Sequence, residues 1–193
     1  ELLHQWMVYS HHGAPLWDLE RGGNDTFGPA VVQADDDPGL ELVVAGSEAI
    51  RFYDDDGTPG WTWTNTGTTR FGGPCVADFD GDGSPELAVP NGRQLLLFEL
   101  DGTVYARATV SDTSSLAACS GFDLDGDGAV EVLFADEVAL RVLDGRTGAA
   151  RLTMDDHQSQ TITEYPVVAD LDGDGSAEIL VVSSRLWDDC CWR

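Results

Sequence analysis

Lysine is absent from this chain, and all ten basic residues are arginine. That absence excludes phosphate-binding loops that need a lysine and catalysis through a lysine Schiff base. The chain also lacks the G-x-S-x-G and H-E-x-x-H motifs of common hydrolases. No apolar run approaches the roughly 18 residues of a membrane span. We therefore expect a non-enzymatic protein, with no catalytic residue and no membrane insertion.

Positive charge is scarce as well. The 193 residues carry 35 acidic and 10 basic side chains, for a net charge of −25. A surface this acidic repels phosphate backbones, so nucleic acid is not expected as a partner. The 42% content of hydrophobic residues is enough for a core, and the length suits one domain.

An acidic loop with two glycines occurs three times, as D-x-D-G-D-G-x-x-E at 78–86, 123–131 and 170–178. A diverged copy lies at 33–41. The first positions of the copies are 45, 45 and 47 residues apart (33 to 78, 78 to 123, 123 to 170). A fixed period of this size indicates a repeat architecture.

The composition of this loop favours calcium. Carboxylates at positions 1, 3, 5 and 9 converge on one point, because the two glycines let the backbone curl tightly. With a carbonyl from position 7 they offer the many oxygen ligands that Ca²⁺ prefers. The loops contain no Cys or His, which argues against zinc.

Two other interpretations of the loop are an EF-hand and a plain acidic turn. An EF-hand needs a glutamate at position 12, where this chain has Val89, Phe134 and Val181. Asp and Gly also favour plain turns, but three copies that keep the glutamate argue against that. In the diverged copy Gln33 and Pro38 replace Asp and Gly, and both interpretations stay open there.

Short apolar segments and Asp-Gly turns surround each loop, and Asp-Gly is a strong hairpin signal. Four short antiparallel strands per period of about 45 residues are typical of a propeller blade. The expected strands are 29–32, 40–45, 49–53 and 60–65; 75–77, 86–89, 94–99 and 103–109; 118–122, 130–135, 139–143 and 149–154; and 166–169 and 177–182.

The last repeat has two strands only, and the amino end supplies two more at 4–9 and 15–19. We therefore predict an all-β, four-bladed β-propeller closed by the N-terminal strands pairing with the C-terminal repeat. Alternatively, the chain is cut from a longer propeller, or its end strands pair with a neighbouring molecule. The expected blades are about 26–65, 70–110, 115–155, and 163–184 plus 1–20, in one domain of residues 1–184 with a tail at 185–193.

The four cysteines are disulfide candidates. Cys75 and Cys119 hold nearly the same place in successive repeats, so they either pair across units or are small buried residues. Cys190 and Cys191 are adjacent, which suggests a vicinal disulfide, bonds to other partners or free thiols. Calcium loops that need roughly millimolar ion indicate an extracellular setting, where disulfides persist.

With the loops and strands placed, the chain resembles the FG-GAP/VCBS family of calcium-loop propellers, which includes the integrin α-subunit head repeats. The family name matches Phe71-Gly72-Gly73-Pro74 and Phe27-Gly28-Pro29-Ala30, whereas the third and fourth repeats depart from it at 115–118 and 164–166. The resemblance covers residues 1 to about 184. Members of the family usually have more than four blades.

The resemblance implies a secreted or cell-surface propeller that is braced by Ca²⁺ and serves adhesion, recognition or surface assembly. Its partner would be a protein or a glycan. Alternatives are a lectin-like module that uses some of the six tryptophans as sugar platforms, and a self-assembling subunit of an extracellular filament.

Three calcium sites are expected, with a weaker fourth at the diverged copy. Carried over by position, the ligands are Asp78, Asp80, Asp82, Ser84 (carbonyl) and Glu86; Asp123, Asp125, Asp127, Ala129 (carbonyl) and Glu131; Asp170, Asp172, Asp174, Ser176 (carbonyl) and Glu178; and Asp35, Asp37, Gly39 (carbonyl) and Glu41.

Overall fold

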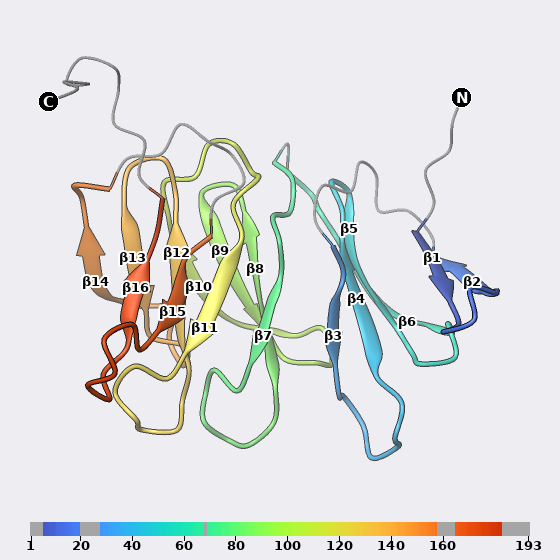
Figure 1. The fold of residues 1–193 in the computed structure, drawn as a ribbon. Coiled ribbons are helices and arrows are strands. Elements are labelled where there is room, and N and C mark those ends of the chain that lie inside the picture. The colour runs from blue at the N-terminus through green and yellow to red at the C-terminus, as the bar shows by residue number, and fades with distance from the viewer. Residues whose placement is uncertain (1–5, 20–27, 68, 158–164, 183–193) are drawn as a thin grey trace, which may run out of the picture.

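The computed structural model describes residues 6–19, 28–67, 69–157 and 165–182, and within these ranges the protein is built from strands (Figure 1). None of the described residues belongs to a helix of the length and apolarity needed to cross a membrane. Cys190, Cys191 and Phe27, on which the sequence made predictions, lie outside the described residues.

Three four-stranded antiparallel sheets form the body of the molecule, and consecutive strands are neighbours in each. We name them blades 1, 2 and 3 in chain order, and they stand side by side in Figure 1. The strands are β3 (Ala30–Val32), β4 (Glu41–Ala45), β5 (Ala49–Tyr53) and β6 (Pro59–Thr64) in blade 1; β7 (Cys75–Ala77), β8 (Glu86–Asn91), β9 (Gln94–Phe98) and β10 (Val104–Thr109) in blade 2; and β11 (Cys119–Phe122), β12 (Glu131–Ala135), β13 (Leu140–Leu143) and β14 (Ala150–Met154) in blade 3.

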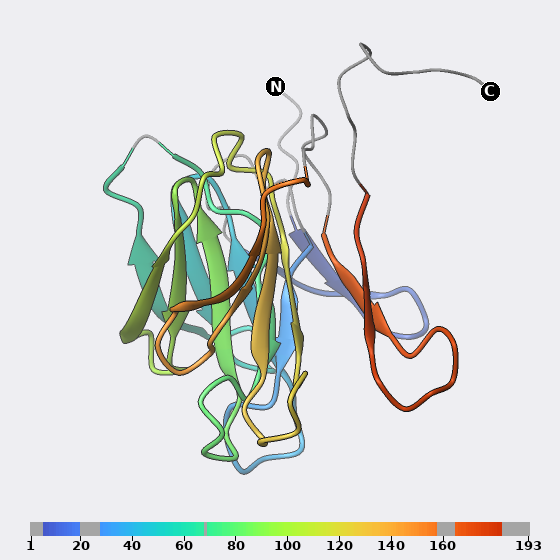
Figure 2. The ribbon, with the colours of Figure 1, turned by 90° about the vertical axis from the view of Figure 1, so that its left-hand side faces the viewer.

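A two-stranded hairpin lies at each end of this row. One consists of β1 (Trp6–Tyr9) and β2 (Pro15–Leu19), the other of β15 (Val167–Ala169) and β16 (Glu178–Leu180). The two hairpins are separate sheets: in Figure 1 β1–β2 lies beside blade 1 and β15–β16 in front of blade 3, and in Figure 2 both lie on the same side of the three blades. The described strands show no pairing between the two ends of the chain, and the closed fourth blade stays a prediction.

Aromatic side chains pack between blades 1 and 2. Large side chains fill the space between blades 1 and 2, where the Trp61 ring stacks between Phe52 and Phe98, with centroids 5.7 and 6.2 Å away. Trp63 packs edge-on against Phe71 and Phe98. These contacts join β6 of blade 1 to β9 of blade 2.

Blades 2 and 3 share a second core cluster, which includes Leu95, Leu97 and Phe134. Cys75 on β7 and Cys119 on β11 form a disulfide bond at this interface, with their Cα atoms 5.7 Å apart. The bond joins the first strands of two neighbouring blades. It thereby ties together segments 44 residues apart in the sequence.

Candidate metal centres

Each acidic loop joins the first two strands of a blade or hairpin, and all four loops lie along the same edge of the row, the lower edge in Figure 1. In the second loop Gly81 and Gly83 have φ values of 80° and 96°. Side chains rarely adopt this left-handed region, which explains why glycine stands at positions 4 and 6. The corresponding glycines of the third and fourth loops have positive φ as well.

Backbone amides orient the carboxylates of the loop. Asp78 at position 1 accepts hydrogen bonds from the amides of Gly81 (2.7 Å) and Gly83 (2.9 Å). Asp80 accepts one from the amide of Asp82 at 2.9 Å, and Asp82 one from that of Ser84 at 2.8 Å. Loops 123–131 and 170–178 repeat this pattern. The carboxylates are thus held in a shared arrangement by the loop itself.

The glutamate at position 9 completes the second loop. Glu86 is 0% exposed, and its Oε2 accepts a hydrogen bond from the Phe79 amide at 2.7 Å. Its Oε1 is buried and has no hydrogen-bond partner among the described residues. Oxygens of all four predicted carboxylates, Asp78, Asp80, Asp82 and Glu86, lie within 4.8 Å of one another. A hard dication at their centre would satisfy the buried oxygen and offset the repulsion.

Burial raises the pKa of Glu86 to about 7, and the neighbouring Asp80 and Asp78 charges act in the same direction. Hydrogen bonds from backbone amides oppose the shift without cancelling it. Burial thus disfavours the ionised form of Glu86, and a bound cation would stabilise that form.

The other two intact loops gather part of their predicted sets. Asp123, Asp125 and Asp127 come together in the third loop, whereas Glu131 contacts Arg151 instead. In the fourth loop Asp170, Asp172 and Glu178 come together without Asp174. Sequence reasoning missed Arg151, because its role depends on the distance between two strands rather than on the loop motif.

The diverged first loop is built differently. The Gln33 side-chain amide donates hydrogen bonds to the carbonyls of Asp35 and Asp37, both at 2.8 Å. Asp35 and Glu41 group with Asp54, and Asp37 is not part of this group. The predicted set of Asp35, Asp37, Gly39 and Glu41 is therefore not assembled as such. Asp54 was missed because it follows β5, outside the loop, just before a segment that reads as a turn.

Neighbouring loops are connected. The Val130 amide donates a hydrogen bond to the Asp78 carbonyl at 2.9 Å, which joins the third loop to the second. Arg146, from the turn after β13, donates to the Asp80 carbonyl (2.9 Å) and to Asp127 Oδ2 (2.8 Å). The backbone at Gly145 comes so close to the second loop that a Cβ there would lie 2.3 Å from the Phe79 carbonyl oxygen.

The substitution Glu86→Gln is expected to remove part of the pH dependence of the metal-free protein. The folded pKa of Glu86 is raised from 4.5 to about 7, so the folded chain binds this proton more tightly than the unfolded chain. Its contribution to stability is therefore present below pH 4.5 and is lost as the pH rises through 7. Urea unfolding in chelator at pH 5 and 7.5 measures this. A wild-type-to-variant difference that is the same at both pH values would contradict it; Asp36→Asn, at an exposed loop position, is the control.

Residues 123–181, from the third loop through blade 3 to the fourth loop, match the sequence profile of the FG-GAP-like repeat. The chain carries an FG-GAP repeat. The matched segment contains two of the three intact loops and the strands between them. No curated protein matches the sequence.

Solved structures share the fold of this chain. The biofilm matrix protein Bap1 of V. cholerae superposes with a TM-score of 0.67 at 16% identity, over 92% of this chain and 56% of that one. BBS1N, solved in complex with ARL6DN, gives a TM-score of 0.58 at 15% identity, over 84% of this chain and 53% of that one. BamB from Moraxella catarrhalis gives 0.55 at 16% identity, over 86% and 51%. The chain thus spans a little over half of each, and the likeness establishes a propeller-like all-β fold.

Proposed function

We propose that this protein is a non-enzymatic, calcium-stabilised β-propeller module that acts outside the cell by binding other molecules. The second loop carries the proposal, because it gathers four carboxylates within 4.8 Å of one another and leaves a buried glutamate oxygen without a hydrogen-bond partner in the described part of the chain. Such a set of oxygens suits Ca²⁺. The third and fourth loops have the same motif and the same internal hydrogen bonds.

Two features support the extracellular assignment. The Cys75–Cys119 disulfide joins two blades, and disulfides persist in oxidising compartments. Exposed calcium loops that require roughly millimolar ion are matched to extracellular calcium. The fold is shared with a biofilm matrix protein, and at that level of identity the likeness concerns the fold alone.

A binding role fits the environment of the clustered carboxylates better than catalysis does. In the described loops these carboxylates accept backbone hydrogen bonds or pair with arginine. The lectin-like alternative loses two of its candidate platforms, since the rings of Trp61 and Trp63 pack between blades 1 and 2. We therefore propose that surfaces other than these two rings bind the partner.

Calcium titration by calorimetry is expected to give three ions per chain. Asp80→Asn removes one ligand of the second loop and is expected to reduce the number to two, while Asp36→Asn leaves it at three. Asp36 is exposed and belongs to the diverged loop, which makes it a matched control for charge. Three ions in the Asp80→Asn variant would contradict the assignment of this loop.

A further inference from the structure

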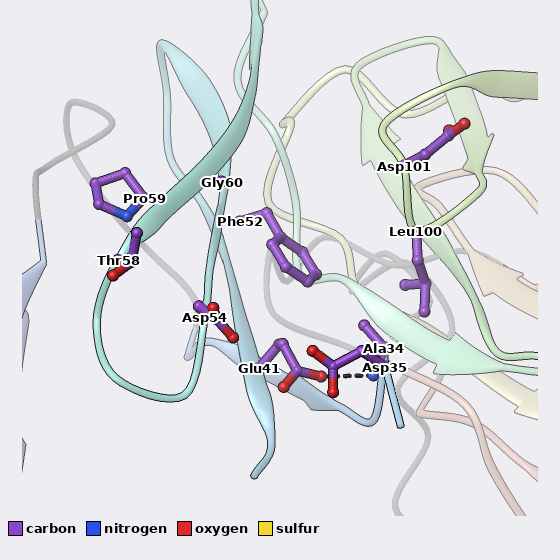
Figure 3. Close-up of a pocket in the computed structure, with 10 residues that line it drawn as sticks. All are labelled: Ala34, Asp35, Glu41, Phe52, Asp54, Thr58, Pro59, Gly60, Leu100 and Asp101. Atoms are coloured by element: carbon purple, nitrogen blue, oxygen red, sulfur yellow. Dashed lines mark hydrogen bonds between the residues drawn. The ribbon is translucent and has the colours of Figure 1, made fainter. Parts of the chain in front are cut away.

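A pocket opens beside the first loop, where blade 1 meets blade 2 (Figure 3). Its volume is about 360 Å³, which is far more than a single ion needs. Asp35 and Glu41 line it from the loop region, Asp54 from the end of β5, and Leu100 and Asp101 from the turn of blade 2. None of the residues that line it is basic.

Three carboxylates face one another in this pocket. Oxygens of Asp35, Glu41 and Asp54 lie within 4.8 Å of one another. Glu41 is 1% exposed; its Oε2 accepts a hydrogen bond from the Ala34 amide at 2.5 Å, as drawn in Figure 3. Its Oε1 is buried and has no hydrogen-bond partner among the described residues. A buried carboxylate oxygen without a donor lowers the stability of the fold, so a cationic donor that binds from outside would stabilise this site.

Blade 3 contains the same three carboxylates with a cation among them. Asp125 and Glu131 hold loop positions 3 and 9, as Asp35 and Glu41 do in blade 1. The guanidinium of Arg151 lies between them, with Nη1 2.7 Å from Asp125 Oδ2 and 2.5 Å from Glu131 Oε1. Its Nη2 lies 2.9 Å from Oδ2 of the third carboxylate, Asp144.

The turn hydrogen bonds fix which residues correspond. The Asp54 amide donates to the Thr58 carbonyl in blade 1, and the Asp144 amide donates to the Ala149 carbonyl in blade 3. Asp54 therefore corresponds to Asp144. Two residues beyond each acceptor stand Gly60 and Arg151, so Gly60 occupies the position of the arginine.

Blade 2 fills the same position with Tyr105. The Glu99 amide donates to the Thr103 carbonyl, and Tyr105 follows two residues later. Its hydroxyl donates a hydrogen bond to the Gly145 carbonyl of blade 3 at 3.0 Å. Of the three described blades, only blade 1 leaves this space open, because Gly60 has no side chain.

We propose that this pocket binds the guanidinium group of an arginine side chain presented by a partner protein. The ion pairs of Arg151 in blade 3 are an internal example of the complex. A guanidinium donates several hydrogen bonds from a planar group and stacks on aromatic rings, and Phe52 lines the pocket. The net charge of −25 would attract a basic partner.

A bound divalent ion suits the pocket less well. Ca²⁺ requires six to eight oxygens in a tight shell, whereas Asp37 does not join the carboxylates of this pocket and Gln33 and Pro38 replace the Asp and Gly of the intact loops. The neighbouring loop is braced by the Gln33 amide, which donates to the two carbonyls that face it. The arginine inference deepens the binding role proposed above; it concerns the first loop, whereas the calcium proposal concerns the three intact loops.

Titration with N-acetyl-L-arginine amide, followed by calorimetry in calcium-containing buffer, tests the proposal. We expect one bound molecule per wild-type chain. Gly60→Arg supplies the missing guanidinium from β6, as Arg151 does from β14, and is expected to abolish binding.

Asp54→Asn provides a test that leaves the backbone at position 60 unchanged. Loss of one ion pair is expected to weaken binding about tenfold, equivalent to about 1.4 kcal/mol, while Asp36→Asn changes it less than twofold. This variant decides the question if Gly60→Arg does not fold, since a Cβ at position 60 lies 2.9 Å from Phe52 Cδ1 and the ring must shift.

Three results would overturn the proposal: no binding of the arginine amide to the wild type, undiminished binding to Asp54→Asn, or a fourth calcium ion that is lost in Asp54→Asn and is not displaced by the arginine amide. The calcium proposal is tested by Asp80→Asn in the second loop, and the arginine proposal by Asp54→Asn beside the first loop. Failure of one titration therefore leaves the result of the other interpretable.

Discussion

Removal of calcium by an excess of chelator is expected to lower the Tm of the protein by roughly 15 to 30 °C. An ion that binds only the folded state contributes about 2.7 kcal/mol when its free concentration is 100 times its Kd, so three sites contribute about 8 kcal/mol. For a domain of this length each kcal/mol shifts the Tm by roughly 2–4 °C. Thermal scans by circular dichroism with calcium and with chelator measure the shift.

A triple variant that carries Asp80→Asn, Asp123→Asn and Asp170→Asn is the matched control. One ligand is lost in each intact loop, so calcium is expected to stabilise this variant far less than the wild type. Magnesium is expected to restore little of the Tm, because it demands a smaller octahedral shell and keeps more of its water. An identical melting curve for the wild type with calcium and with chelator would refute a structural role for the ion.

Replacement of both disulfide cysteines, Cys75→Ala with Cys119→Ala, is expected to cost about 4 kcal/mol of stability. The bond closes a loop with a sequence separation of 44 residues, and the entropy that such a cross-link removes from the unfolded chain gives this magnitude. The expected fall in Tm is roughly 8–16 °C. Urea unfolding at fixed calcium concentration compares the variant with the wild type.

Reduction with dithiothreitol is the control, because it breaks the bond and keeps both cysteine side chains. It is expected to lower the stability of the wild type toward that of the double variant and to leave the double variant unchanged. Cys119 is 7% exposed, so the alanine variant also reports any loss of packing. A wild-type protein equally stable with and without reductant would show that the bond does not support the interface between blades 2 and 3.

The strands of this protein could be predicted closely from its sequence. The expected and observed ranges differ by one or two residues at most strand ends, and β2, β5 and β7 match the prediction. The reason is local: each Asp-Gly turn and each acidic loop marks where a short apolar strand stops, and the period repeats these marks.

The arrangement of the blades could not be predicted in the same way. The number of strands per period is consistent with a ring closed by the two ends, yet the described hairpins at the ends form separate sheets. How one blade sits against the next depends on side-chain packing such as that of Trp61 on Phe98, which no repeat pattern reveals.

The candidate metal sites also differ in how far the sequence alone predicts them. The second loop assembles all four carboxylates that its motif contains, because a nine-residue loop determines its own geometry. Contacts from other segments altered two of the remaining loops. Arg151 engages Glu131 from a strand twenty residues away, and Asp54 joins Asp35 and Glu41 from the end of β5.

The hydrogen bond from the Val130 amide to the Asp78 carbonyl has a consequence for how ions load. Asp78 is the first ligand position of one loop, and Val130 precedes the last ligand position of the next. Ordering either loop around an ion therefore restricts the backbone of its neighbour. Filling of the first of these two centres should lower the entropic cost of filling the second, and the binding isotherm should then rise more steeply than that of independent sites.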